Sequence, residues 1–151
     1  MATFSTLDFG IDGGIARITL NRPESANGIS MQLAQELLQV SLACRCSAQV
    51  RAVLLTGKGR MFCAGGDLNS FVENAANLQG FIKELTTYLH AAIANFAHMR
   101  APLIIAVNGA AAGAGFSLAA CGDLVLAARS AKFSMAYTRA DLVPDGSGSY
   151  F

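Results

Sequence analysis

Short apolar runs alternate with longer amphipathic stretches along this chain, and the alternation predicts an α/β fold. The runs at 50–56 and 103–107 are apolar at nearly every position, which is typical of strands covered on both faces in a largely parallel sheet. A third run, at 15–20, follows a turn at 12–14, so we expect it to form a hairpin with 4–11.

Two longer helices are expected between these strands. Ser30 can cap the first, over about 31–46, and the second extends from about 78 to 99, where Pro102 follows shortly afterwards. Four leucines of the first helix are expected to share its buried face: Leu33, Leu37, Leu38 and Leu42. The remaining elements are short: a helix at 113–121 and strands at 123–128 and 132–135.

The composition adds an expectation about the surface. Hydrophobic residues make up 53% of the 151 residues and charged residues only 14%, so we expect another subunit or a missing segment to cover part of the surface. The net charge of +1 comes without a basic patch, which gives no support to a nucleic-acid partner. The apolar stretch 103–128 is interrupted by Asn108 and Asp123, so no membrane span is expected there.

Four cysteines show no metal-ligand spacing, so no metal is expected: Cys44, Cys46, Cys63 and Cys121. Free, buried thiols of this kind are typical of intracellular proteins. The first ten residues lack a basic region followed by an apolar run, which gives no indication of a secretory signal. We therefore expect a cytoplasmic protein.

Two glycine-rich segments follow buried strands and are the main candidates for chemistry. The segment 62–68 reads Phe-Cys-Ala-Gly-Gly-Asp-Leu, and 108–117 reads Asn-Gly-Ala-Ala-Ala-Gly-Ala-Gly-Phe-Ser. Small residues let a ligand oxygen approach backbone N–H groups, so the two segments together predict a site for an anionic oxygen. A tight turn is the alternative for the first segment.

The second segment also fits the G-x-x-x-G-x-G spacing of short-chain dehydrogenases, which makes an NAD(P) enzyme an alternative. About a hundred residues precede it, however, whereas a dinucleotide loop follows the first strand of its fold. The run 115–119 resembles a nucleophile elbow but lacks the final glycine, which argues against a serine nucleophile.

Four segments together resemble the enoyl-CoA hydratase/isomerase (crotonase) superfamily in order and spacing: 18–23, 62–68, 106–115 and 133–148. The resemblance implies a crotonase-like spiral of ββα units that binds an acyl-CoA thioester, and assembly as a homotrimer or hexamer. Such proteins are longer, with C-terminal helices that are missing here. We therefore interpret 1–151 as a single acyl-CoA-binding core, truncated at its C-terminus.

The resemblance further implies chemistry through a thioester enolate, with the amides of Ala64 and Ala114 as the two donors to the thioester oxygen. No cofactor is expected beyond the coenzyme A that the substrate carries. The helical residues 71–88 are expected to line or cover the acyl pocket. The residues expected to contact the substrate are Ala26, Gly65, Gly66, Asp67, Leu68, Gly113 and Tyr137.

The acid/base residues decide the reaction. At the two positions where hydratases of the family carry glutamates, this chain has Ser117 and Tyr137. One carboxylate remains, Asp145, and a single carboxylate suits the 1,3-proton shift of an isomerase. The alternatives are a hydratase, a decarboxylase that relies on Tyr137, a silent acyl-CoA binder, or Asp145 as a mere turn residue. His90 and His98 are expected to be surface or partly buried histidines rather than catalysts.

Overall fold

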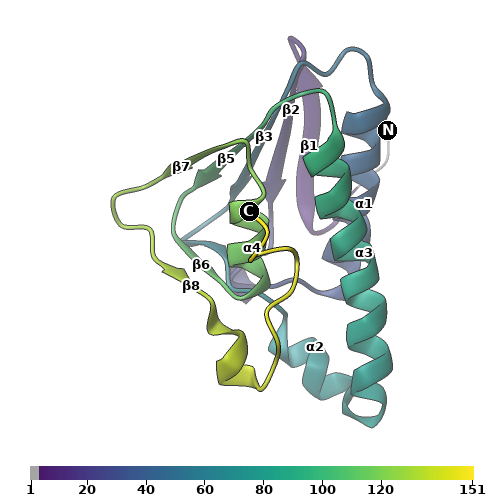
Figure 1. The fold of residues 1–151 in the computed structure, drawn as a ribbon, viewed down its shortest axis with the longest axis vertical. Coiled ribbons are helices and arrows are strands. Elements are labelled where there is room, and N and C mark those ends of the chain that lie inside the picture. The colour runs from purple at the N-terminus through teal and green to yellow at the C-terminus, as the bar shows by residue number, and fades with distance from the viewer. Residues whose placement is uncertain (1–3) are drawn as a thin grey trace.

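The computed structural model of this chain describes residues 4–151, and its strands form two sheets (Figure 1). The larger sheet has the order β1-β2-β3-β5-β7. Its first pair is the expected antiparallel hairpin, and all its other neighbours run parallel. Its strands are β1 (Leu7–Asp12), β2 (Ile15–Leu20), β3 (Ala52–Gly57), β5 (Leu103–Val107) and β7 (Leu124–Ala127).

A second, smaller sheet has the order β4-β6-β8 and is also parallel. It consists of β4 (Met61–Cys63), β6 (Ala110–Ala112) and β8 (Phe133–Ser134). The chain visits the two sheets in turn, so β3 is followed by β4, β5 by β6 and β7 by β8. With a helix after each pair, this is the expected spiral of ββα units. The single sheet and plain loops expected from the sequence missed β4 and β6.

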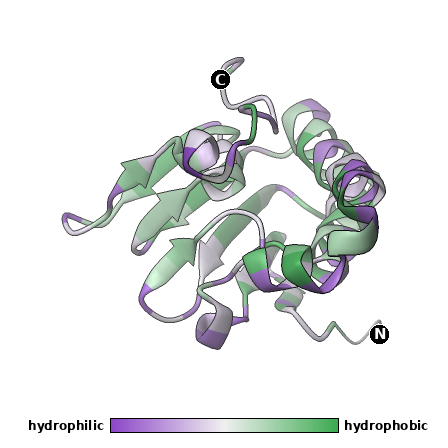
Figure 2. Ribbon diagram, turned by 90° about the horizontal axis from the view of Figure 1, so that it is seen from below, coloured by the Kyte–Doolittle hydropathy of each residue, from purple (hydrophilic) through white to green (hydrophobic). Residues whose placement is uncertain are grey.

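The helices α1 (Met31–Cys46) and α3 (Leu78–His98) pack side by side against the larger sheet (Figures 1 and 2). Both agree closely with the predicted ranges, and the Ser30 hydroxyl caps α1 by accepting the amide of Leu33. Two shorter helices, α2 (Leu68–Glu73) and α4 (Ala114–Ala120), follow β4 and β6. Three 3-10 turns complete the elements: η1 (Pro23–Ser25), η2 (Ala75–Asn77) and η3 (Ala136–Ala140).

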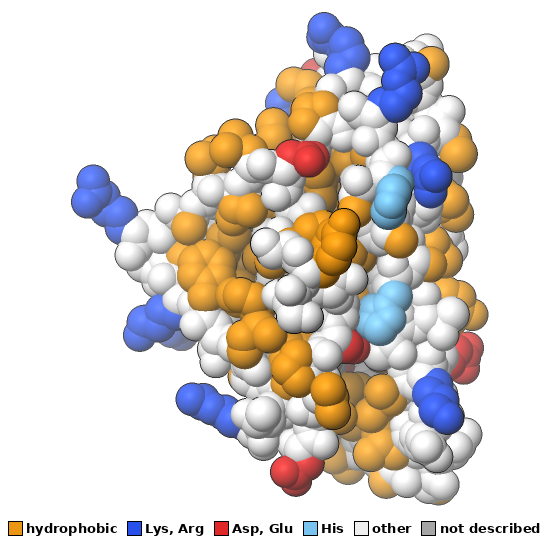
Figure 3. Space-filling model, in the orientation of Figure 1, with side chains coloured by type: hydrophobic (Ala, Val, Ile, Leu, Met, Phe, Trp, Pro, Cys, Tyr) orange, Lys and Arg blue, Asp and Glu red, His pale blue; other side chains and the backbone are white. Residues whose placement is uncertain are grey.

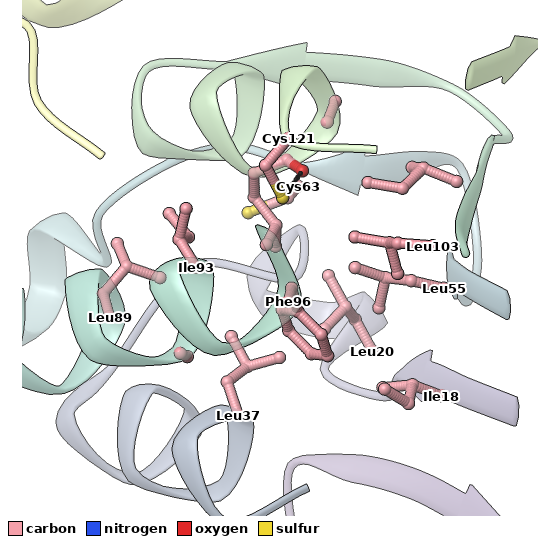
Figure 4. Close-up of a cluster of buried hydrophobic side chains, with 14 of the residues drawn as sticks. Ile18, Leu20, Leu37, Leu55, Cys63, Leu89, Ile93, Phe96, Leu103 and Cys121 are labelled. Atoms are coloured by element: carbon pink, nitrogen blue, oxygen red, sulfur yellow. Dashed lines mark hydrogen bonds between the residues drawn. The ribbon is translucent and has the colours of Figure 1, made fainter. Parts of the chain in front are cut away.

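The core lies between the two long helices and the larger sheet (Figure 4). Leu37 of α1 and Phe96 of α3 point toward Leu20 and Leu55 of the strands. The expected buried face of α1 was partly wrong, because Leu42 is 44% exposed. The face that is buried includes Leu33, Leu37, Val40 and Cys44, whose spacing of four, three and four residues follows the helix repeat.

Glu36 of α1 is a buried carboxylate that accepts hydrogen bonds on both of its oxygens. Glu36 is 2% exposed, and its Oε1 accepts the amide and hydroxyl of Ser5 at 2.9 and 3.0 Å. Its Oε2 accepts the amide and hydroxyl of Thr6, and Gln32 donates to Oε1 at 2.8 Å. Glu36 therefore ties the segment before β1 to the helix that covers the sheet.

The cysteines differ from the expectation in one position. Cys44, Cys63 and Cys121 are buried and free, but Cys46 is exposed at the end of α1. Burial raises the pKa of the Cys44 thiol to about 11 and those of Cys63 and Cys121 to about 12. The three buried thiols thus stay protonated at neutral pH.

The edge of the structure formed by β7 and β8 carries exposed apolar side chains. The composition led us to expect such an apolar region on part of the surface. Leu124, Leu126 and Phe133 are 46–57% exposed, and Figure 3 shows hydrophobic side chains gathered on this face. Coverage by another subunit or segment stays a prediction. In the part of the chain that the structure describes, no helix combines the length and apolar character needed to cross a bilayer.

Candidate functional site

A cavity of about 630 Å³ opens between the ends of the smaller sheet, the helix α3 and the segment around η3. One wall is apolar and is formed by Phe71 after β4 and by Ile82, Leu85 and Leu89 of α3. Of the range 71–88 that was expected to line or cover an acyl pocket, the residues that line this cavity are Phe71, Ile82, Leu85 and Thr86. The opposite wall consists of backbone and polar groups from three separate segments, and there the candidate chemistry lies.

The two glycine-rich loops lie side by side because β4 and β6 are neighbours in the smaller sheet. Gly65 has φ +97, and a Cβ there would lie 2.8 Å from the carbonyl oxygen of Ala112. A Cβ on Gly115 would lie only 2.3 Å from the carbonyl oxygen of Cys63. These glycines are therefore needed for the close packing of the two loops as well as for access to their backbones.

The second loop does not have the surroundings of a dinucleotide site. Its Asn108 and Gly109 connect two strands, β5 and β6, that belong to different sheets. A dinucleotide loop instead connects a strand directly to a helix of the same βαβ unit. The local spacing of glycines was compatible with both arrangements, and only the second strand, β6, distinguishes them.

The amide of Ala64 is not the donor that the sequence led us to expect. It already donates to the carbonyl oxygen of Ala26 at 3.0 Å, so it is not free for a ligand. The carbonyl of Gly65 and the amide of Asp67 are also engaged, since both bond to Ile29. Gly66 lies between these two bonds, and its own amide has no acceptor within residues 4–151.

The amide of Ala114 is the second unbonded donor. Ala114 is the first residue of α4, where helix geometry leaves the amide without an intrahelical acceptor. No other acceptor bonds it in the described part of the chain. Gly66 and Ala114 both line the cavity, and Ala114 N would lie 3.4 Å from a Cβ on the intervening Gly65. The candidate donor pair is therefore Gly66 and Ala114.

The loop that carries Gly66 is anchored by a charge pair. Asp67 Oδ2 and Arg22 Nη2 are 2.8 Å apart, and Asp67 Oδ1 caps α2 through the amide of Asn69. Burial raises the pKa of the Asp67 carboxyl, but the bond to Arg22 and its charge outweigh burial, so the pKa is lowered overall. Arg22 also donates to the carbonyl of Gly28. Asp67 lines the cavity as a fixed anion that is already paired.

Of the other expected contacts, Leu68 and Gly113 line the cavity, and Leu68 is 60% exposed at its rim. Ala26 is not part of the lining, although its neighbour Ser25 is. Ala26 has the left-handed φ of 53 and supports the loop through the Ala64 bond described above. The following residue, Asn27, is fully buried. Its side-chain oxygen accepts a hydrogen bond from the amide of Arg22, and its NH₂ group donates to the carbonyls of Lys58 and Met61. These bonds fix the turn.

The residues at the two hydratase glutamate positions bond to each other. The hydroxyl groups of Ser117 and Tyr137 are 2.7 Å apart, and both are buried. Each hydroxyl also lies within hydrogen-bond distance of the Asp145 carbonyl oxygen, Ser117 at 2.8 Å and Tyr137 at 3.3 Å. Because each carries a single proton, one donates to the carbonyl while the other donates within the pair. Burial raises the pKa of the Tyr137 hydroxyl, so it stays neutral. Tyr137 lines the cavity, as expected, but its hydroxyl serves to hold the backbone of Asp145.

Asp145 lies on the cavity wall, where the sequence placed the candidate base. Its Oδ2 is 3.3 Å from Nε2 of His90, while its Oδ1 is buried and has no partner among the described residues. Burial raises the pKa of the carboxyl, but the contacts with His90 and Tyr137 outweigh burial and lower it. Asp145 is therefore ionised at neutral pH and has one oxygen free.

His90 was not among the expected site residues. It lies on α3, 55 positions before Asp145, and nothing in the local sequence distinguishes it from His98. The ring also receives the amide of Gly146 at Nε2, at 3.1 Å. His90 directly follows Leu89, which lines the cavity. This position could indicate a site residue only after the cavity was known.

Comparison with known proteins supports the same family from independent directions. A family model described as Enoyl-CoA hydratase/isomerase matches residues 10–151. The "Probable enoyl-CoA hydratase" of Rhodobacter capsulatus is 40% identical over 149 residues, covering 99% of this chain and 56% of the relative. The 1,2-epoxyphenylacetyl-CoA isomerase of Escherichia coli is 38% identical over 141 residues, covering 93% and 54%.

The fold agrees with this match. The crystal structure of an enoyl-CoA hydratase from Polaromonas sp. JS666 superimposes with a TM-score of 0.88 at 35% identity, covering 95% of this chain and 56% of that one. The chain thus spans little more than half the length of the relatives it matches. The match to the family model, the relatives and the shared fold together establish that this chain belongs to the enoyl-CoA hydratase/isomerase family.

Proposed function

We propose that the protein carrying this chain is an acyl-CoA isomerase that shifts a double bond through a thioester enolate. One observation carries the proposal: the Asp145 carboxylate lines the same cavity as the two unbonded amides of Gly66 and Ala114. The amides are suited to an oxyanion and the carboxylate to a proton. The other carboxylate that lines the cavity in the described part of the chain, Asp67, is already paired with Arg22.

The two amides would stabilise the enolate. As a proton leaves the carbon next to the thioester carbonyl, negative charge moves onto the carbonyl oxygen, where it would accept the N–H groups of Gly66 and Ala114. One donor of this kind contributes about 3–4 kcal/mol to transition-state stabilisation. The same stabilisation lowers the pKa of the substrate carbon, so a carboxylate of ordinary basicity is sufficient.

Asp145 would both remove and return the proton. Its carboxylate takes a proton from one carbon of the acyl chain, the double bond moves by one position, and the resulting carboxylic acid gives the proton to another carbon. No proton or water is consumed overall. Asp67 lines the same cavity, but its carboxylate is already held by Arg22 and α2. Asp145 is therefore the better candidate.

A hydratase is the second candidate, favoured by the 40% identity with the Rhodobacter capsulatus relative. Hydration needs groups that position and activate water. At the two positions where the family resemblance predicts glutamates, this chain has the neutral pair Ser117 and Tyr137, and each hydroxyl is engaged with the other and with the Asp145 carbonyl. The neutral pair favours isomerisation. It is also compatible with a decarboxylase or with a silent acyl-CoA binder.

The test uses the protein expressed from its own gene, supplied with 3-enoyl-CoA thioesters. Formation of 2-enoyl-CoA is followed by chromatography, and 3-hydroxyacyl-CoA or loss of CO₂ would reveal hydration or decarboxylation. Replacing Asp145→Asn should reduce isomerisation by roughly 10²–10⁴-fold, the usual contribution of a general base, with acyl-CoA binding retained.

Asp141→Asn is the matched control. Asp141 is exposed four residues earlier, and its left-handed φ of 53 is one that asparagine also adopts readily. It should leave turnover unchanged. The proposal is wrong if Asp145→Asn isomerises as fast as the wild type, or if the wild-type protein binds acyl-CoA tightly but never turns it over.

A further inference from the structure

His90 and Asp145 are brought together from two elements that are far apart in the sequence. His90 lies near the middle of α3, and Figure 3 shows both histidines of the chain on the same face of the molecule, along this helix. The Nε2 atom of His90 is 3.3 Å from Asp145 Oδ2. Within the described residues, Tyr137 is the other side chain that lowers the pKa of the Asp145 carboxyl, and Oδ1 has no hydrogen-bond partner.

The rest of Asp145 is held through its backbone. Its carbonyl oxygen accepts a hydrogen bond from the amide of Gly148 at 3.1 Å and lies within hydrogen-bond distance of the bonded hydroxyl pair of Ser117 and Tyr137. The next residue, Gly146, has φ +58, and a Cβ there would lie 2.9 Å from the Cβ of Ser117. The backbone at this position is thus fixed, whereas the direction of the carboxylate depends on His90.

The Nε2 atom of His90 lies within hydrogen-bond distance of two groups, Asp145 Oδ2 and the Gly146 amide. It can donate to the first or accept from the second, but not both at once. Carrying a proton, it donates to Asp145 Oδ2; without one, it accepts the amide of Gly146 at 3.1 Å. The imidazole ring therefore stays beside Asp145 in either tautomer. The second tautomer offers no donor to the carboxylate, so only the first can fix its orientation.

We propose that His90 is a positioning residue for Asp145: its Nε2–H holds Oδ2 and so fixes the direction of the carboxylate that takes the substrate proton. This inference rests on the function proposed above and goes beyond it by assigning the orientation of the base to a residue on α3. Oδ1 is buried and has no protein partner among the described residues, so no hydrogen bond to that oxygen fixes the carboxylate instead.

The proposed role predicts a loss of rate rather than of binding. Without the Nε2–H, the carboxylate is free to rotate away from the reacting carbon, and misplacement of about 1 Å can cost roughly 10²-fold in rate. Because Asp145 is 27% and His90 47% exposed, water can partly replace the bond, so we expect a decrease in kcat of roughly 10–100-fold for His90→Leu. KM for the acyl-CoA should stay within about twofold, because His90 itself does not line the cavity.

The pH dependence gives a readout that a merely structural role would not change. The His90 contact lowers the pKa of Asp145 against the effect of burial, so removing it should raise that pKa. The acid limb of kcat/KM should therefore move to higher pH in His90→Leu. Carboxyl ¹³C NMR of the same proteins should show Asp145 titrating at higher pH, and this measurement does not depend on knowing the best substrate.

Two further variants complete the experiment. His90→Gln keeps an N–H donor without the imidazole ring, so it should recover most of kcat. His98→Gln is the matched control, since His98 is exposed on the same helix and its Nδ1 bonds only the carbonyl of Ala94 within its own helix. It should behave as the wild type. Thermal unfolding of each variant identifies any that fails to fold. If His90→Leu does, the Asp145 titration in His90→Gln decides, since losing the electrostatic effect of the ring on the carboxyl should still raise the pKa of Asp145.

The outcomes separate this inference from the proposed function. If Asp145→Asn is inactive while His90→Leu keeps wild-type kcat, an unmoved acid limb and an unmoved Asp145 titration, the positioning role is refuted and the isomerase proposal stands. If Asp145→Asn keeps full activity, the isomerase proposal fails and the role of His90 fails with it.

Discussion

Glu36 provides the sharpest test of how the fold is held together, because it is a buried carboxylate with hydrogen-bond donors from Ser5, Thr6 and Gln32. Replacing Glu36→Gln keeps the size and shape of the side chain but removes the negative charge. It also presents an NH₂ group to one of the two sets of donors from Ser5 and Thr6. We expect the variant to fold but to be markedly less stable, because buried donors then lack an acceptor.

The magnitude follows from the pKa of the Glu36 carboxyl. Burial raises this pKa, but the hydrogen bonds from Ser5, Thr6 and Gln32 more than compensate and lower it from 4.5 to about 2. Since one pKa unit corresponds to 1.36 kcal/mol, the ionised carboxylate contributes roughly 3 kcal/mol to the free energy of unfolding at neutral pH. The pKa is lowered in the folded state, so this contribution is complete above pH 4.5 and is lost as the pH falls toward 2.

The assay is urea unfolding of wild type and Glu36→Gln at a series of pH values. The difference in unfolding free energy should be roughly 3 kcal/mol at pH 7 and about 1.4 kcal/mol at pH 3. Glu84→Gln, an exposed glutamate on α3, is the control and should show no comparable difference. A difference below about 1 kcal/mol at pH 7, or one that does not change between pH 5 and pH 3, would refute the reasoning.

Two further predictions follow from packing. Native protein treated with a disulfide reagent at pH 8 should release one equivalent rapidly, from the exposed Cys46. The buried Cys44, Cys63 and Cys121, with pKa values of about 11 to 12, should react only on unfolding; a Cys46→Ser variant that still reacts rapidly would contradict this. Gly115→Ala should destabilise the protein by about 1–3 kcal/mol or prevent its folding, because the Cβ meets the Cys63 carbonyl at 2.3 Å. Gly10→Ala, which meets nothing within 4 Å, should be tolerated, and equal thermal stability of the two variants would show that the loops can separate.

The long elements were predictable because their patterns are long. The helix over residues 31–46 has a capping serine and four turns of periodic apolar residues, and the structure has it over the same range. The strand β5 is a continuous apolar run bounded by a proline, and it too was found at its predicted residues. In both elements the local sequence and the tertiary packing favour the same structure, so the local sequence is sufficient to predict them.

The smaller sheet was not predictable by the same reasoning. β4 and β6 have three residues each, and β6 is a run of three alanines, which has neither strand periodicity nor strand propensity. Their pairing depends on β3 and β5 being neighbours in the other sheet, so that the segments following them meet. A contact of this kind arises from the topology, and no window of the sequence contains it.

The wrong prediction at Ala64 also arose from a contact between distant segments. That contact decides which amide of this loop is left without an acceptor. From the sequence, any residue of the Ala64–Gly66 run can offer an amide to a ligand. The turn at Ala26 removes one of them, because its left-handed backbone aims a carbonyl at the Ala64 amide. The bonds of Ile29 to Gly65 and Asp67 then leave the Gly66 amide, on the cavity wall, without an acceptor among the described residues. The donor is thus selected by a segment forty residues upstream, much as the orientation of Asp145 is proposed to depend on α3. Both halves of the proposed chemistry, the oxyanion and the base, are set by contacts between segments distant in the chain, and substitutions at Ala26 or His90 should therefore affect catalysis without belonging to either motif.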